Sequence, residues 1–210
     1  MNFKYAAHSY INDWLGWEKR FHDTLSPKGE NPVDPESGAR VLAEVAAYYR
    51  VARTLPERDE SSRLISAYQD LLAIPGVTVF EVPNVVDGYA EALNSKYGRT
   101  ALSAASKFLW VRFREPVIIY DSITSDWLAR NAGFRYNGYR DFCEAWLNAY
   151  QLHEDEIRDA CYQLNSIRPF ILNAISEREL NELSSETWFM KRVFDYAMIY
   201  LPVTTTTLGA

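Results

Sequence analysis

Along most of the chain, an apolar residue recurs every three or four positions. The clearest case covers residues 5–25, where the large apolar side chains fall four, three and four residues apart: Tyr10, Trp14, Trp17 and Phe21. This spacing places the four side chains on one face of an amphipathic helix. Strict alternation of apolar and polar residues, the pattern of a half-buried strand, is not sustained over any long stretch.

Further helices are expected between the proline, glycine and polar breaks. The expected ranges are 37–54, 58–73, 84–97, 100–113, a helix starting at 122, 138–150, 154–165, 169–177 and 185–200. Ser37 and Asp121 have the side chains preferred at helix starts, and Gly98 has the conformational freedom preferred after a helix end. Short extended pieces are expected at 77–82 and 117–120. The sequence therefore predicts an all-α fold with little or no β structure.

The longest break between helices lies near the N-terminus. Three prolines and two glycines fall between Pro27 and Gly38. Such composition ends helices and favours turns. Residues 26–36 are therefore the expected linker between two helical lobes.

Composition narrows the class of protein. The 210 residues are 48% hydrophobic and 14% aromatic with a net charge of −6, so we expect a packed protein that does not coat nucleic acid indiscriminately. Two cysteines, Cys143 and Cys161, are too few for a disulfide framework or a four-cysteine metal site. We expect a cytoplasmic protein without metal or cofactor. No membrane association is expected either, because no apolar run approaches the ~20 residues of a membrane span.

Lys107 is the first candidate for chemistry. In a helix over 100–114, Leu102, Ala105, Leu109 and Phe113 form the buried stripe, and Lys107 lies on another face, near the small side chain of Ser103. A lysine nucleophile needs such room, and it must also lose its proton through burial or nearby positive charge. The alternative is an ordinary solvated surface lysine.

Asp121 is the second candidate. An aspartate before Ser122 is a good helix N-cap, a role that contributes about 1 kcal/mol and involves no chemistry. A carboxylate at a helix N-terminus also stays ionised, because backbone N–H groups stabilise its charge. The structural and the chemical interpretation of Asp121 are compatible.

Two short segments carry a family resemblance: Ser106-Lys107-Phe108-Leu109 and Ile119-Tyr120-Asp121-Ser122. Together they resemble the core of the helix-hairpin-helix DNA glycosylases, in particular short bacterial members of the 8-oxoguanine DNA glycosylase-like branch. Residues 194–198 resemble a closing helix of those proteins. The resemblance implies a two-lobed all-α fold with a cleft near Lys107 and Asp121, with residues 37–115 in a central lobe and residues 1–25 plus 122–210 in a second lobe.

The resemblance also implies an activity, namely removal of a damaged or modified base from double-stranded DNA. Lys107 would attack the sugar carbon of a flipped-out nucleotide, and Asp121 would activate the amine and stabilise the positive charge that develops on the sugar. The resulting Schiff base can open the strand, an AP-lyase activity.

The sequence departs from the family pattern at four places. The interval from Lys107 to Asp121 is several residues shorter, and the Gly-apolar-Gly hairpin that holds DNA phosphates in the family is missing before Lys107, where only Gly98 remains upstream. Ile123 stands where a histidine often follows the aspartate, and two cysteines cannot form the four-cysteine cluster of the endonuclease III relatives.

Charge around these candidates is unevenly distributed. Residues 99–140 contain seven basic and three acidic side chains, a net charge of +4, which leaves −10 for the rest of the chain. One interpretation is that this segment lines one DNA-binding cleft. The alternative is that its basic residues form solvated helix faces paired with neighbouring acids. Its candidate substrate-binding residues are Arg99, Ser103, Trp110, Arg112 and Arg114, with Trp110 as a platform on which a base can stack.

A second hypothesis keeps the fold without the chemistry. The missing hairpin and the acidic remainder of the chain suit a non-catalytic helical interaction protein, such as a component of a bacterial defence or toxin–antitoxin system. The two hypotheses differ in geometry: an enzyme requires Lys107 and Asp121 to converge in a cleft, whereas an interaction protein leaves them in separate surroundings.

Overall fold

The computed structural model describes residues 1–26, 33–52, 60–132 and 137–200. Across these ranges the chain forms helices and connecting turns without a strand, so the predicted all-α fold is confirmed. The elements in chain order are α1 (Phe3–Asp13), the π-helix η1 (Trp14–Glu18), α2 (Lys19–Leu25), α3 (Pro35–Tyr48), α4 (Glu60–Ala73), α5 (Val82–Tyr97), α6 (Leu102–Phe113), α7 (Ser122–Ala132), α8 (Tyr139–Gln151), α9 (Glu154–Tyr162), the 3₁₀ helix η3 (Gln163–Phe170), α10 (Glu177–Ser185) and α11 (Thr187–Tyr200).

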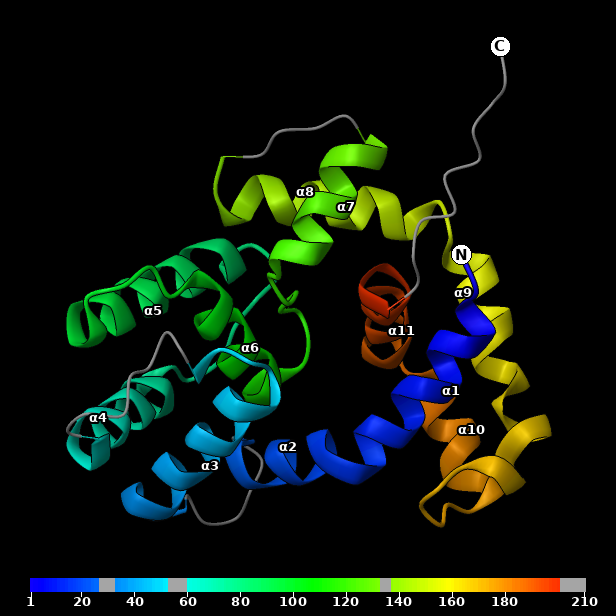
Figure 1. The fold of residues 1–210 in the computed structure, drawn as a ribbon, viewed down its shortest axis with the longest axis horizontal. Coiled ribbons are helices and arrows are strands. Elements are labelled where there is room, and N and C mark those ends of the chain that lie inside the picture. Colours follow the sequence, from blue (N-terminus) through cyan, green and yellow to red (C-terminus); the bar gives the residue numbers. More distant parts are fainter. Residues whose placement is uncertain (27–32, 53–59, 133–136, 201–210) are drawn as a thin grey trace.

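The helices form two groups that share one hydrophobic core. In Figure 1, α3 to α6 lie on one side, α1 and α9 to α11 lie on the other, and α7 with α8 crosses above them. Helix α2 packs on α3 and α6, whereas α1 packs on α11 and α9, so the N-terminal segment contacts both groups. The predicted division into residues 37–115 and residues 1–25 plus 122–210 stays a prediction. Residues 27–32 of the expected linker lie outside the described residues.

The N-terminal helix is one continuous rod with a wider turn in its middle. At η1 the backbone N–H of Lys19 bonds to the carbonyl of Trp14, five residues back, instead of the usual four. The turn brings Glu18 into the core, where it is fully buried. The rod thus joins both helical groups and delivers a carboxylate between them.

Helix α6 lies at the centre of the molecule. All residues from Ala104 to Arg112 are buried, while Leu102 and Phe113 at the ends of the expected stripe are only half-buried. The single-stripe prediction was too narrow, because α2, α3 and α5 all pack against this helix. Lys107 is only 3% exposed, so its interpretation as a solvated surface lysine is wrong.

Several helix boundaries differ from the expected ones. Helix α3 begins earlier than Ser37, with Pro35 in its first turn and the Asp34 side chain accepting the Ser37 N–H at 3.0 Å. Residues 77–78 have no regular structure and residues 79–81 form a turn that leads into α5, so no strand forms there. Gly98 ends α5 in the left-handed conformation, at φ 66°, as predicted.

The largest error in the helix predictions concerns residues 169–185. A helix was expected at 169–177, but η3 ends at Phe170 and α10 begins only at Glu177. A capping box explains this start, because the Ser176 hydroxyl accepts the Glu179 N–H and the Glu179 carboxylate accepts the Ser176 N–H.

Candidate active site

Lys107 and Asp121 converge, as an enzyme would require. The Lys107 Nζ donates to Asp121 Oδ2 at 2.9 Å and to Ser103 Oγ, one turn earlier on α6, at 2.7 Å. Asp121 is the residue before α7, and its Oδ1 accepts the Ile123 N–H at 2.9 Å. The carboxylate therefore caps α7 and pairs with the lysine at the same time.

The extended segment between α6 and α7 holds Asp121 in this position. Ile118 is fixed on both sides by the Tyr139 hydroxyl, which accepts its N–H at 3.1 Å and donates to its carbonyl at 2.5 Å. The Tyr120 N–H donates to the hydroxyl of Ser106, the neighbour of Lys107, at 3.0 Å. Buried side-chain hydroxyls thus replace the strand partner that this apolar segment lacks, and they set the register of Asp121 against α6.

A pocket of about 660 Å³ opens at this pair. Its lining comes from both helical groups: Asp13, Tyr48, Tyr49, Arg50, Val51, Ser103, Lys107, Ile119, Asp121, Ser122, Ile123, Arg192, Tyr196 and Ile199. The Lys107 side chain is 4% exposed and that of Asp121 is 22% exposed. The carboxylate is therefore the more accessible member of the pair, and the lysine side chain is almost fully buried.

The surroundings make Lys107 a weaker base than a surface lysine. Burial lowers the pKa of Lys107 from its ordinary value, and the positive charge of Arg192 lowers it further. The charge and hydrogen bond of Asp121 oppose this shift, as does the charge of Asp195, without cancelling it. A lowered pKa increases the fraction of neutral amine, which is the nucleophilic form.

A second buried cation, Arg192 of α11, lies next to this site. Its guanidinium bonds to Glu18 Oε1 at 2.9 Å and to Asp195 Oδ2 at 3.0 Å. The other Asp195 oxygen accepts the indole N–H of Trp146 at 2.8 Å. Burial raises the pKa of Asp195 to about 6, against the opposing effects of Arg192 and Trp146.

Tyr49 connects this buried network to the lysine. Its hydroxyl donates to Glu18 Oε1 at 2.7 Å. Its ring centre lies 6.0 Å from the Lys107 Nζ and 5.9 Å from the guanidinium carbon of Arg192. Sequence reasoning missed Glu18, Tyr49 and Arg192; the available signal was a charged pair three residues apart, Arg192 and Asp195, inside the apolar run of the last helix.

Trp110 does not lie in the pocket. Its side chain is 3% exposed, with the Arg192 guanidinium 4.8 Å from its ring centre and the Trp188 ring 6.4 Å away. The prediction of a stacking platform is therefore corrected: Trp110 is a core residue, because α6 is enclosed on several faces.

The expected basic cleft does not form either. Arg112 is buried and donates to the carbonyl oxygens of Leu25 and Ile74 at 3.0 and 3.4 Å. It therefore connects α6 to the C-terminal ends of α2 and α4. The Arg114 guanidinium lies 4.6 Å from the ring centre of Trp188, beside a different pocket. Arg99 is exposed beyond the end of α5 and is not part of the Lys107 pocket.

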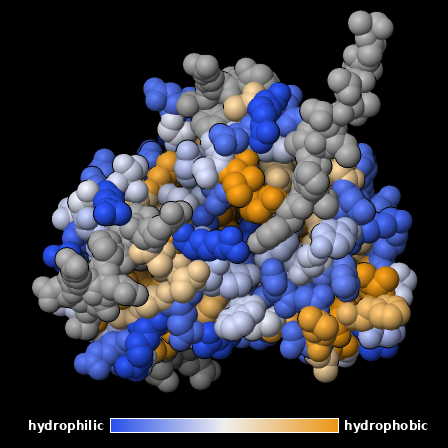
Figure 2. All heavy atoms as spheres, in the orientation of Figure 1, coloured by the Kyte–Doolittle hydropathy of each residue, from blue (hydrophilic) through white to orange (hydrophobic). Residues whose placement is uncertain are grey.

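Of the described basic residues between 99 and 140, Lys107 alone lines this pocket; Arg135 lies outside the described residues. The prediction of one basic cleft is therefore wrong for the described part of the segment. In the view of Figure 2, hydrophilic side chains cover much of the surface and are interrupted by hydrophobic patches. Ser103 remains at the site as expected, and Arg50, which the sequence did not single out, joins it.

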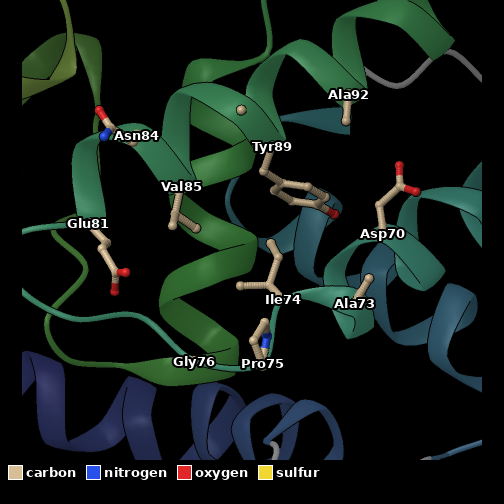
Figure 3. A pocket seen from close by; sticks show the side chains of 11 residues that line it. Asp70, Ala73, Ile74, Pro75, Gly76, Glu81, Asn84, Val85, Tyr89 and Ala92 are labelled. Carbon is tan, nitrogen blue, oxygen red and sulfur yellow. The ribbon is translucent and has the colours of Figure 1, made fainter.

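A separate pocket of about 620 Å³ lies between the end of α4 and the start of α5. Figure 3 shows Asp70 at one end, Glu81 and Asn84 at the other, and the apolar side chains of Ile74 and Tyr89 between them. Asp70 is ion-paired with Lys96 at 2.7 Å. The pocket lining contains acids and no basic residue, so it offers no counterpart to the Lys107 site.

The remaining expectations concern metals, thiols and membranes. Cys143 and Cys161 are free and buried, as expected of small core residues. In the described ranges, no group of three or more histidine, cysteine, aspartate or glutamate side chains is arranged to hold a metal ion. None of the described helices has the length and apolar character required to cross a membrane.

The arrangement can therefore supply one buried amine of lowered pKa, one more accessible carboxylate, and aromatic side chains on the wall of a shared pocket. Comparison of the chain with protein-family models, with curated proteins and with solved structures finds no match.

Proposed function

We propose that the protein is a cytoplasmic DNA glycosylase-like enzyme that removes a damaged base of the 8-oxoguanine kind through a Schiff base on Lys107. The observation that carries the proposal is the 2.9 Å contact between Lys107 Nζ and Asp121 Oδ2 in a pocket shared by two helical groups. The two free, buried thiols suit the reducing conditions of the cytoplasm.

The reaction begins with a proton transfer. Lys107 gives a proton to a carboxylate or water, and its neutral amine attacks C1′ of an extruded nucleotide. As the bond between Lys107 Nζ and C1′ forms, the glycosidic bond between C1′ and the base breaks. Its electron pair leaves with the base, which takes up a proton. The positive charge that develops on the sugar is stabilised by the fixed Asp121 carboxylate.

Strand opening follows from the same intermediate. The attached nitrogen loses a proton, the C1′–O4′ bond breaks and O4′ takes up a proton, which gives a Schiff base between Lys107 and C1′. Loss of a proton from C2′ then lets the 3′ phosphate leave, which breaks the strand. Water releases Lys107 at the end, so the enzyme is regenerated.

The pocket suits a flipped-out nucleotide in size and in lining. Its volume of about 660 Å³ lies in the range of small-molecule sites. Tyr48 and Tyr49, which are partly exposed, contribute aromatic rings to its wall, and bases stack on such rings at a gain of about 1–3 kcal/mol each. These tyrosines take the role that was expected of Trp110.

Borohydride trapping tests the proposal directly. The protein is incubated with duplexes that carry 8-oxoguanine or an abasic site, and borohydride reduces any Schiff base to a stable adduct. We expect an adduct with the wild type and none with Lys107→Ala. Lys96→Ala is the matched control, because Lys96 is also ion-paired but lies near Asp70, away from the site.

Two outcomes would count against this function. Wild-type protein that forms no adduct on an abasic duplex lacks the proposed nucleophile. An adduct of equal yield in Lys107→Ala would mean that another amine reacts, and Lys107 would lose its assigned role.

The second candidate function is a non-catalytic interaction protein. The observation that favours it is the dispersal of the described arginines of residues 99–140, together with the acidic remainder of the chain. The convergence of Lys107 and Asp121 counts against this candidate, in which the pair would serve only the fold. This candidate predicts no adduct on any lesion and no measurable affinity for duplex DNA.

A further inference from the structure

Arg50 has an unusual backbone conformation for its residue type. It follows the end of α3 at φ 56°, in the left-handed region. The Val51 N–H bonds to the Ala46 carbonyl at 2.8 Å, and the Arg50 N–H bonds to the Ala47 carbonyl at 3.1 Å. These two bonds define a Schellman motif, in which glycine is the usual residue at the position of Arg50 because it has no Cβ.

The fold does not account for the Arg50 side chain. The side chain is exposed, it lines the Lys107 pocket, and no described residue forms a hydrogen bond or ion pair with its guanidinium. Arg114 provides the contrast: it also has a positive φ, of 58°, but its guanidinium lies over the Trp188 ring at 4.6 Å. Strained residues with no packing reason concentrate at functional sites.

The positively charged side chains that line the pocket indicate which class of ligand Arg50 can bind. Of the three cations in its described lining, Lys107 is bonded to Asp121, and Arg192 is bonded to Glu18 and Asp195. Arg50 is the remaining cation, and within the described residues it has no carboxylate partner. A guanidinium binds phosphate oxygens through two parallel N–H donors, which suits an anion that approaches from solvent.

We propose that Arg50 is a phosphate-binding residue that contacts a phosphodiester next to the nucleotide in the Lys107 pocket. The inference rests on the proposed function, since a nucleic acid strand is the ligand. The sequence lacks the glycine-containing hairpin before Lys107 that would hold the DNA backbone, so another residue must supply a phosphate contact. One arginine at the pocket rim thus supplies a backbone contact that the segment before Lys107 does not offer.

The Arg50→Gly variant separates this role from a structural one. Glycine fits the left-handed position better than arginine, so the variant should melt at the wild-type temperature or up to about 4 °C higher. Its affinity for an abasic duplex should nevertheless fall about tenfold. The Arg50→Lys variant keeps the charge and should keep most of the affinity.

The salt dependence of binding gives a second readout, measured by fluorescence anisotropy on a labelled abasic duplex. Loss of one phosphate contact should reduce the slope of log affinity against log salt by about 0.9 in Arg50→Gly. Arg178→Ala is the matched control, because it removes an equal charge from an exposed position on α10, outside the pocket. It should leave the slope unchanged.

The outcomes distinguish this inference from the proposed function. If the wild type forms no borohydride adduct and does not bind DNA, the proposed function fails, and the Arg50 role fails with it. If the wild type forms the adduct but Arg50→Gly binds with unchanged affinity and slope, only the Arg50 role is overturned. A melting temperature of Arg50→Gly below the wild-type value would assign Arg50 to the fold and would also overturn it.

Discussion

Lys107 and Arg192 are both almost fully buried, yet their surroundings give them opposite properties. Arg192 has two carboxylate partners whose side chains are 0% and 4% exposed, whereas the single carboxylate partner of Lys107 is 22% exposed. Burial opposes the charge of Arg192, but Glu18, Tyr49 and Asp195 outweigh this effect and raise the pKa of Arg192 above its ordinary value. Burial lowers the pKa of Lys107, and one aspartate does not reverse the shift.

The comparison teaches how one protein uses buried charge in two ways. Arg192 lines the same pocket, but its two carboxylates are buried and also accept from Tyr10, Tyr49 and Trp146, so the network links α11 to the N-terminal rod and to α8. The Lys107 pair is open, with a carboxylate that faces a pocket. Loss of one member of a buried network with many partners leaves the others unpaired and destabilises the structure, whereas a buried charge with few partners is available for chemistry.

Removing Arg192 should have the largest effect on stability. Arg192→Met leaves Glu18 and Asp195 buried without their cation, and breaking a buried pair in this way costs about 3–5 kcal/mol. Urea unfolding followed by tryptophan fluorescence measures the loss. The triple variant Arg192→Met, Glu18→Gln, Asp195→Asn removes all three charges and should recover part of it. A loss below about 1 kcal/mol for Arg192→Met would contradict the view of this network as a structural core.

Asp121→Asn should have its main effect on chemistry. Asparagine caps helices as well as aspartate does, but it lacks the negative charge that stabilises the positive charge developing on the sugar. Base release should therefore slow by about 100-fold at pH values where Lys107 is fully neutral. The amine is reactive when neutral, so the rate rises with pH up to a plateau. Because Asp121 raises the pKa of Lys107, the midpoint of this rise should move to lower pH in the variant.

The control for this variant is Asp34→Asn, the same change at the N-cap of α3. It should leave both the rate and the midpoint unchanged. A midpoint that moves to higher pH in Asp121→Asn, or does not move, would mean that Asp121 does not influence the protonation of Lys107.

Lys107→Met should have the smallest effect on stability. The charged lysine carries a burial cost at all pH values below its lowered pKa, and methionine removes this cost. The Asp121 carboxylate that remains is partly solvated and still accepts the Ile123 N–H. The free energy of unfolding should therefore change by less than about 1 kcal/mol, measured in urea at pH 7. If the free energy of unfolding fell as much as in Arg192→Met, Lys107 would have a mainly structural role.

The local part of the site could be predicted from the sequence, and the rest could not. Lys107 and Asp121 lie in short segments whose helix spacing and capping signals are readable without tertiary information. Glu18 and Arg192 are 174 positions apart and meet only because α11 packs against the N-terminal rod. The burial of Trp110 and Arg112 had the same cause, since periodicity identifies one apolar face and does not report how many neighbours surround a helix.

The boundary of α10 shows a different limit. The start signal was present, as Ser176 and Glu179 have the spacing of a capping box. The expected helix at 169–177 instead followed the apolar residues after Pro169. Here local capping chemistry decided the boundary, and apolar content was the weaker guide.

The wide turn at η1 also determines which changes in chain length the protein tolerates. A Cβ added at Gly16 would meet only the Asn173 side chain, at 3.8 Å, so substitution there is mild. Deleting Gly16 would restore the regular helical bond, and α1 and α2 would keep nearly their present orientation, because the wide turn holds one residue more than a regular turn over about the same arc. Deleting a residue inside α1 or α2 would instead rotate the two helices against each other by about 100°. We therefore expect the chain to tolerate the loss of one residue at this turn better than within either flanking helix.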